Sequence, residues 1–140
     1  MFKRILCPID LTTLSTVALD VASKLGVQND ATISLVHVAL SPLPRSVEPA
    51  RDWERNANAR LGRLAQRHFG DRVRWDTVIF HGDPAKVIMR AADDLDADLI
   101  VMATHGHKGF NRLLLASGTE QVVRESSLPV RTIRPGRPQR

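Results

Sequence analysis

Five short apolar runs alternate along the chain with stretches of helical periodicity, and this alternation constrains the fold more than any other feature. The runs are Ile5 to Ile9, Ile33 to Val38, Val73 to Phe80, Leu99 to Ala103 and Val130 to Ile133. Between the first two runs, apolar residues recur at helical spacing from Leu14 to Leu25, and Gly26 follows as a stop signal. Strands that alternate with helices predict an α/β fold with a parallel sheet.

The five predicted strands differ in how completely apolar they are. The first, second and fourth runs are nearly continuous, as expected of strands that are covered on both faces. The third and fifth alternate with charged residues such as Arg74, Asp76 and Arg131, which indicates half-exposed edge strands. With right-handed crossovers, these observations favour an open, Rossmann-like sheet of order 3-2-1-4-5 with helices on both faces. The winding then reverses between the first and fourth strands, so we expect a ligand crevice at their carboxyl ends.

The size and charge of the chain limit its partners. At 140 residues with a net charge of +5, it is long enough for one domain, which we place at residues 1–134. The remaining residues, 135–140, form a basic tail of the kind that is usually disordered and solvated. Four Phe, two Trp and no Tyr are too few aromatic side chains for a base-stacking platform, so we do not expect a nucleic-acid partner.

The single cysteine and the hydropathy pattern indicate in which cellular compartment the protein is found. Cys7 rules out an internal disulfide and fits a reducing compartment. Pro8 and Asp10 interrupt the apolar start of the chain, so we expect no signal peptide, and no apolar run reaches the length of a membrane span. These features predict a cytoplasmic protein.

Polar residues and glycines gather where the crevice is expected. Asp10 follows the first strand, where it either caps the first helix or accepts a hydrogen bond from a ligand hydroxyl. Ser117 opens the last helix and precedes Glu120 by three residues, the spacing of a capping box. Alternatively, Ser117 and the neighbouring N–H groups bind a phosphate at the helix N-terminus. Asp83 followed by Pro84 marks the start of another helix.

Metal sites and familiar catalytic motifs are not predicted. His105 and His107 share a glycine loop and His81 ends the third strand, but two histidines on a loop do not establish a metal site. Cys7 and His37 lie inside apolar strands, so we interpret them as buried core residues. The chain contains neither a P-loop motif nor a nucleophile elbow, and no general base is placed. We therefore do not expect an enzyme.

Several segments together resemble the universal stress protein family over nearly the whole chain: ILCPID, LVHV, HGDPAKVIMRAADDLDADLIVMATHG, RLLLAS and SLPV. The resemblance implies an adenine nucleotide alpha hydrolase-like fold and a stress-related regulatory protein that binds ATP, with Mg, or another adenine nucleotide. Because no general base is placed, we expect at most slow ATP hydrolysis, and an adenylyl-transferring or hydrolytic enzyme of a related α/β class is the remaining enzymatic alternative. It also implies a homodimer joined through the last strand, although Arg131 on an edge strand discourages pairing. The implied nucleotide contacts are Pro8, Asp10, Val38, Ala103, Gly106, Ala116, Ser117 and Gly118.

The chain departs from the family in its phosphate motif, which reads Gly, two residues, Gly, nine residues, then Gly followed by Ser or Thr. The corresponding positions here are Ala103, Gly106, Ala116 and Ser117, so two of three glycines are alanine. If these positions need a positive φ, each alanine costs about 1 kcal/mol, and together they weaken binding about ten- to a hundredfold. With ordinary backbone the loss is small. The alternative function is a protein-interaction module that binds no nucleotide.

Overall fold

The computed structural model describes residues 1–11, 16–39, 50–104 and 116–134, and the backbone alone for residues 50–53 and 116–117. Strands and helices alternate throughout these residues. They are β1 (Arg4–Ile9), α1 (Val17–Asn29), β2 (Thr32–Ala39), α2 (Ala50–His68), β3 (Arg74–His81), α3 (Pro84–Asp94), β4 (Leu99–Ala103), α4 (Ala116–Glu125) and β5 (Val130–Ile133). The strands form one parallel sheet of order β3-β2-β1-β4-β5, which confirms the predicted topology.

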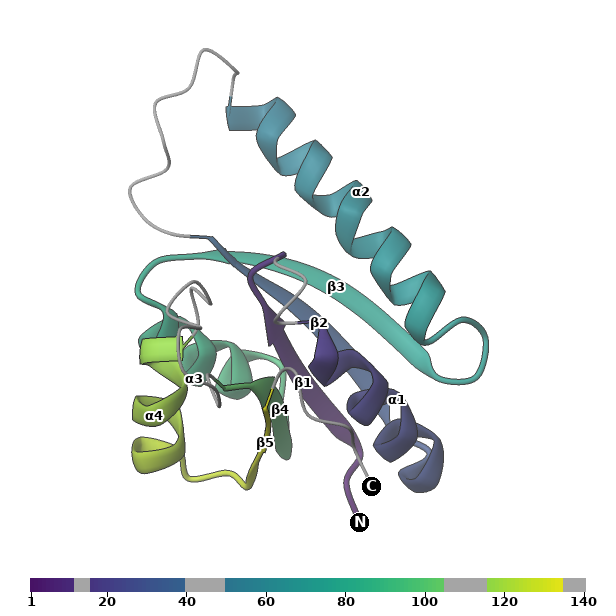
Figure 1. Cartoon of the computed structure of the whole chain (residues 1–140), viewed down its shortest axis with the longest axis vertical. Coiled ribbons are helices and arrows are strands. Elements are labelled where there is room, and N and C mark those ends of the chain that lie inside the picture. The colour runs from purple at the N-terminus through teal and green to yellow at the C-terminus, as the bar shows by residue number, and fades with distance from the viewer. Residues whose placement is uncertain (12–15, 40–49, 105–115, 135–140) are drawn as a thin grey trace.

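The helices cover the two faces of the sheet in pairs, with α1 and α2 on one face and α3 and α4 on the other (Figure 1). Successive side chains of a strand point to opposite faces, so each central strand contributes to two separate cores. The core under α1 and α2 includes Ile5, Cys7, Leu35, Leu61 and Phe69. The core under α3 and α4 includes Leu6, Val36, Val38, Ile88 and Met102.

The edge strands are less buried than the central ones, as the sequence predicted. Every β3 residue from 75 to 80 is half-buried, and Arg131 and Thr132 of β5 are exposed. At the β3 edge, Arg4 of β1 donates to Asp76 over 3.1 Å and to the buried Ser34 hydroxyl over 2.7 Å. The arginine thereby ties three neighbouring strands together on the side of the sheet that carries α3.

The pairing between β1 and β4, which we call the β1–β4 seam, is short. Only Ile5↔Leu99 and Leu6↔Ile100 are in register across it, whereas β1 and β2 are paired from Arg4↔Thr32 to Ile9↔His37. At the amino end of the seam, the Asp98 carboxylate accepts from the backbone N–H groups of Lys3 (2.8 Å) and Arg4 (3.1 Å). Beyond these two pairs, toward the carboxyl ends of the strands, β1 and β4 are not paired: this applies to residues 7–9 of β1 and 101–103 of β4.

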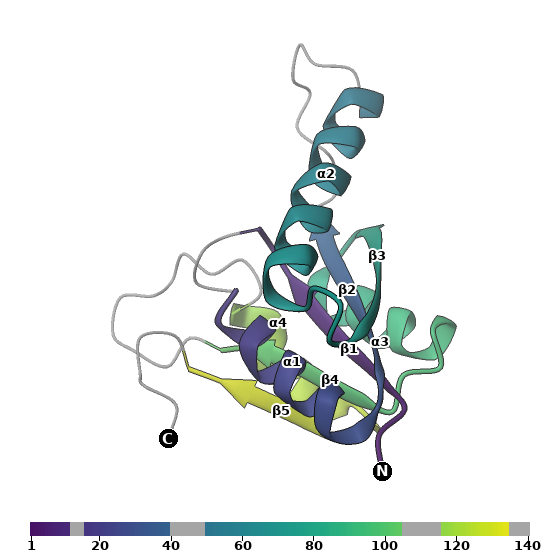
Figure 2. The same ribbon diagram turned by 90° about the vertical axis from the view of Figure 1, so that its right-hand side faces the viewer.

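The helix boundaries confirm one predicted cap and correct another. Asp83 is the N-cap of α3, its carboxylate accepts from the backbone N–H of Lys86, and Pro84 is the first helical residue, as predicted. Of the two alternatives predicted for Asp10, the helix cap is wrong, because α1 begins at Val17 with Thr16 in the capping position. The amino-terminal part of α2 extends beyond the sheet (Figures 1 and 2). Among the described helices, none is long and apolar enough to cross a membrane.

Candidate functional site

Two predicted contact residues lie on one face of the sheet at the carboxyl ends of neighbouring strands. Pro8 follows Leu6 by two residues on β1, so it shares the α3–α4 face with Leu6, and it pairs in register with Val36. Val38 lies two residues beyond Val36 on the same face and is 2% exposed. Because the β1–β4 seam ends at Leu6, Pro8 lies where the two halves of the sheet are no longer paired.

Asp10 extends this apolar platform with a carboxylate. It is the first residue after β1 and is only 6% exposed, so the chain holds an acidic side chain close to the predicted crevice rather than in open solvent. The next residue, Leu11, has a φ of 68°, in the left-handed region that a branched side chain rarely adopts. Backbone strain of this kind is concentrated at functional sites and persists only where surrounding contacts enforce it.

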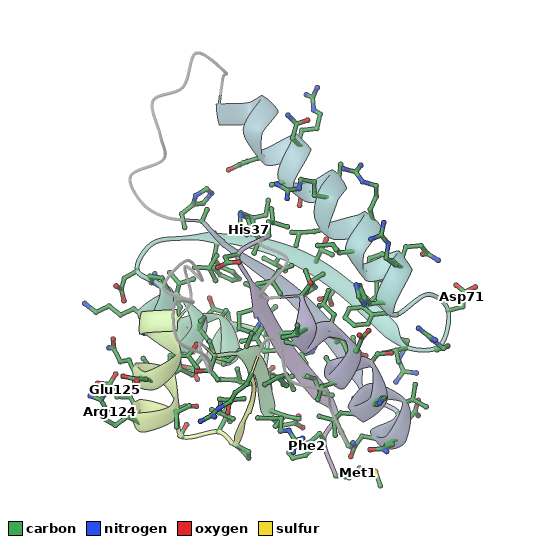
Figure 3. The ribbon with its side chains drawn as sticks, viewed as in Figure 1. Met1, Phe2, His37, Asp71, Arg124 and Glu125 are labelled. Carbon is green, nitrogen blue, oxygen red and sulfur yellow. The ribbon has the colours of Figure 1, made fainter. Side chains whose placement is uncertain are left out.

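Two side chains from other elements contact the turn that contains Asp10. The Nδ1 atom of His37, on β2, donates to the carbonyl oxygen of Ile9 over 3.2 Å, because a carbonyl oxygen can only accept. The guanidinium of Arg60, on α2, donates to the carbonyl oxygen of Leu11 over 3.1 Å. His37 lies at the carboxyl end of the sheet (Figure 3) and is 5% exposed, which confirms the predicted buried histidine.

The charge state of His37 follows from this environment. Burial lowers the pKa of His37 below its ordinary value, and the nearby cationic Arg60 lowers it further. The hydrogen bond to Ile9 and the Asp10 carboxylate act in the opposite direction but are outweighed. His37 is therefore neutral near pH 7.

The two alanines of the altered phosphate motif lie in regular secondary structure. Ala103 is the last residue of β4 and Ala116 the first of α4, so neither has the positive φ that favours glycine. Ala103 is fully buried, and strand alternation puts its methyl group on the α1–α2 face with Leu99 and Val101, opposite to Pro8. The backbone penalty considered for the two alanines is therefore absent.

The first turn of α4 is fixed to β4 and to α3. Thr119 is 1% exposed, and its hydroxyl donates to the carbonyl oxygen of Ala103 over 3.1 Å. A Cβ added to Gly118 would lie 3.1 Å from Cβ of Pro84 and 3.3 Å from the backbone nitrogen of Ala85. Gly118, predicted as a phosphate contact, thus has a packing role, because it allows the starts of α3 and α4 to approach closely.

Some predicted site residues lie outside the described residues or in the part of α4 of which only the backbone is described. Gly106, His105, His107 and the whole segment 105–115 lie outside the described residues, as does the tail 135–140. Ser117 is in the first turn of α4 rather than at its N-cap, and only its backbone is described. Within the described part of the chain, no three metal-ligating side chains lie close enough together to hold a metal ion.

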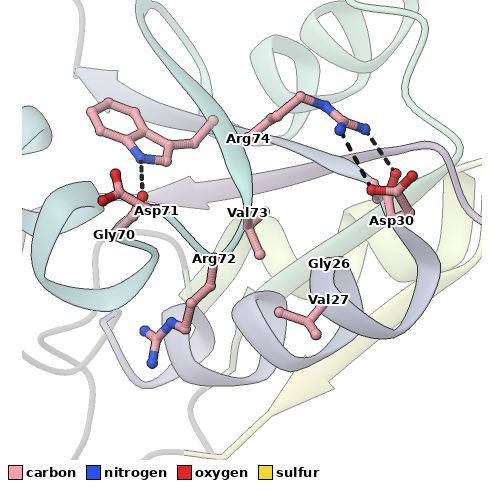
Figure 4. Close-up of a pocket in the computed structure, with 10 residues that line it drawn as sticks. Gly26, Val27, Asp30, Gly70, Asp71, Arg72, Val73 and Arg74 are labelled. Atoms are coloured by element: carbon pink, nitrogen blue, oxygen red, sulfur yellow. Dashed lines mark hydrogen bonds and ion pairs between the residues drawn. The ribbon is translucent and has the colours of Figure 1, made fainter.

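A surface hollow of about 400 Å³ lies at the opposite, amino-terminal edge of the sheet, where α1 ends and β3 begins (Figure 4). Several of its polar groups are bonded within the protein. Arg74 donates to the backbone carbonyl of Asp30 over 2.9 Å and to its carboxylate over 3.4 Å, and the Trp75 indole donates to Gly70 over 3.1 Å. The hollow therefore offers few unsatisfied groups to a ligand, and the crevice at the carboxyl ends remains the better candidate site.

Sequence reasoning missed Leu11, Arg60 and Thr119. Arg60 is 49 residues from the carbonyl that it contacts, and its helical periodicity marks it only as a surface residue. Leu11 carries no sequence signal for a left-handed backbone, since glycine or asparagine is usual there. Thr119 directly follows Gly118, so the motif at Ser117 and Gly118 is the sequence signal that could have indicated it.

Comparison with known proteins gives a consistent result. The sequence model of the universal stress protein family matches residues 1–134. A universal stress protein of Thermus aquaticus is 33% identical, covering 96% of this chain and all of that protein. Two solved structures share the fold. One is a universal stress protein in complex with cAMP (TM-score 0.68, 21% identity, 96% of this chain and 98% of the other). The other is an Archaeoglobus fulgidus universal stress protein in complex with dAMP (TM-score 0.69, 17% identity, the same coverage).

Proposed function

The chain belongs to the universal stress protein family, and from this premise we propose that it is a regulatory protein that binds ATP or another adenine nucleotide at the crevice between β1 and β4. The observation that carries the proposal is the arrangement of Pro8, Val38 and Asp10. Two apolar residues share one sheet face at the carboxyl ends of neighbouring strands, and a largely buried carboxylate follows directly. An apolar platform beside a carboxylate suits a flat base attached to a ribose with hydroxyl donors.

The backbone of the altered motif supports nucleotide binding. Because Ala103 and Ala116 have regular strand and helix backbone, they carry no left-handed strain. The methyl group of Ala103 also lies on the face opposite to Pro8, so it does not come between Pro8 and a base on that face. In this proposal Gly106 and the N-terminus of α4, with Ser117 and Gly118, receive the phosphates, and Mg accompanies ATP. Two universal stress proteins of the same fold hold cAMP and dAMP, so nucleotides with one phosphate belong in the same test.

The test is isothermal titration of nucleotide-stripped protein with Mg-ATP, AMP, cAMP and, for base specificity, Mg-GTP. We expect adenine nucleotides to bind with roughly micromolar to submillimolar affinity and Mg-GTP to bind much more weakly. Asp10→Asn should weaken adenine binding, whereas Asp71→Asn, an exposed aspartate at the opposite edge, should leave it unchanged. Gly106→Val should weaken the phosphate-bearing ligands. The proposal is overturned if no nucleotide at millimolar concentration gives a heat of binding or raises the melting temperature of the protein.

A second candidate function is a protein-interaction module that binds no nucleotide. The two alanines in the phosphate motif favour it, as does the packing role of Gly118, which leaves this glycine explained without a ligand. Retention of adenine nucleotide by the freshly purified protein separates the two functions, because the interaction module would retain none.

We further propose a cytoplasmic homodimer joined through β5. Its backbone lies at the edge of the sheet, but the exposed Arg131 and Thr132 make the strand less apolar than a dimer edge usually is. Light scattering at micromolar concentration tests the dimer, and a strictly monomeric protein would refute it.

A further inference from the structure

The two-residue segment Asp10-Leu11 is held at both ends by side chains from other elements. The carbonyl of Ile9, in the peptide that precedes Asp10, accepts from His37 of β2 over 3.2 Å. The carbonyl of Leu11, in the peptide that follows this segment, accepts from Arg60 of α2 over 3.1 Å. The peptide groups that bracket Asp10 and Leu11 are thus both fixed from outside the β1–α1 connection.

The segment needs such support because its backbone is strained. Leu11 has a φ of 68°, and leucine has no polar side chain with which to stabilise this conformation locally. Strained conformations persist only where neighbouring groups over-determine them. The side chain of Leu11 packs against the core under α1 and α2, and its carbonyl is bound by Arg60, so side chain and backbone are restrained separately.

We propose that Arg60 is a positioning residue for the nucleotide site: by holding the carbonyl of Leu11 it keeps the strained turn, and with it the Asp10 carboxylate, in the orientation that receives the ligand. His37 is the second anchor of the same segment. This inference rests on the proposed nucleotide-binding function. The proposed site thereby gains a residue of α2, Arg60, which is distant in sequence from the phosphate motif. Arg60 acts on the half of the site that holds the base and the ribose.

The exposed helix α2 offers a matched control. Arg63 is on the same helix, is also exposed and carries the same charge, but no hydrogen bond or ion pair is found for it among the described residues. Arg60→Met and Arg63→Met therefore remove the same positive charge and the same functional group. They differ in the contact with Leu11.

The experiment measures the dissociation constants of Mg-ATP and adenosine by isothermal titration for wild type, Arg60→Met, Arg60→Lys and Arg63→Met. Loss of one hydrogen bond should weaken both ligands by about two- to tenfold in Arg60→Met. Arg63→Met should match wild type, and Arg60→Lys, which keeps a cationic donor, should recover part of the affinity. In an Asp10→Asn background, Arg60→Met should have almost no further effect, because its influence passes through the Asp10 carboxylate.

The outcomes separate the possible failures. If wild type binds nucleotide and Arg60→Met equals Arg63→Met, the positioning role is overturned and the proposed function stands. Weaker binding of Mg-ATP with unchanged adenosine binding would mean that Arg60 contacts a phosphate directly, which also overturns it. If the effects of Arg60→Met and Asp10→Asn on the free energy of nucleotide binding are fully additive, Arg60 does not act through Asp10, and the proposal is overturned. Absence of any binding by wild type overturns both proposals.

Discussion

Replacing Thr119 with valine tests whether the start of α4 is held to β4 by a hydrogen bond or only by packing. The two side chains have nearly the same shape, and Thr119 is 1% exposed, so the change leaves the volume of the core almost unaltered. What it removes is the hydroxyl that donates to the carbonyl oxygen of Ala103 over 3.1 Å. The two explanations predict opposite signs for the change in stability.

The magnitude follows from two opposing contributions. Leaving a buried carbonyl without its donor costs about 1–3 kcal/mol. Burying a methyl group in place of the hydroxyl stabilises by about 0.8 kcal/mol. The difference between these contributions is a decrease of roughly 0.2–2 kcal/mol in the free energy of unfolding of Thr119→Val, whereas packing alone predicts a small gain.

Urea denaturation followed by circular dichroism measures the difference. With an m-value of about 2 kcal/mol/M, the expected loss lowers the unfolding midpoint by roughly 0.1–1 M. Thr132→Val is the matched control, since Thr132 is exposed on β5 and the same change there should stay within about 0.5 kcal/mol of wild type. A Thr119→Val protein as stable as wild type, or more stable, would refute the argument.

Three further predictions concern Gly118, His37 and Cys7. Gly118→Val should destabilise the protein by about 1–3 kcal/mol in thermal unfolding, because the new side chain meets Pro84; an unchanged melting temperature would argue against the packing role. The pKa of His37 is lowered in the folded protein, so as the pH falls below about 6.5 the unfolded chain is protonated first and stability declines until the lower folded pKa is reached. His37→Gln should reduce this decline in urea midpoints between pH 7.5 and 5.5, and an unaltered slope would contradict it. Burial raises the pKa of Cys7 to about 12, so iodoacetamide at pH 8 should modify it only on unfolding; equal rates with and without denaturant would disprove this.

The strand order could be predicted from the sequence because burial leaves a direct mark on composition. Leu99 to Ala103 is uninterrupted in apolar residues and is a central strand, whereas Arg131 interrupts the last run and lies at an edge. The Asp83-Pro84 helix start was equally predictable, since the cap and the proline act within one turn of the chain. Local patterns thus specify local structure and the choice between inner and outer strands.

Of the two alternatives predicted for Asp10, the helix cap was wrong, because an aspartate ahead of a helical pattern does not by itself determine where the helix begins. Asp10 precedes a helical pattern at a plausible distance, yet α1 begins seven residues later. The contact between Arg60 and Leu11 could not be predicted, because it depends on how α2 lies across the sheet. For Gly118, the family motif suggested a ligand role, while the close approach of Pro84 became apparent only from the packing of α3 against α4.

The short β1–β4 seam has a consequence for the order in which the chain folds. Strands β1, β2 and β3 are neighbours in the sheet and come from the first 81 residues, with long registered pairings between them. Joining β4 to β1 instead closes a loop of more than ninety residues, and only two residue pairs are in register across that junction. Contacts between distant parts of a chain form late, because closing the intervening loop costs entropy before the contacts compensate. During synthesis, a three-stranded sheet with most of the core under α1 and α2 can therefore assemble before Leu99 leaves the ribosome. The proposed crevice between β1 and β4 then forms only when β4 docks.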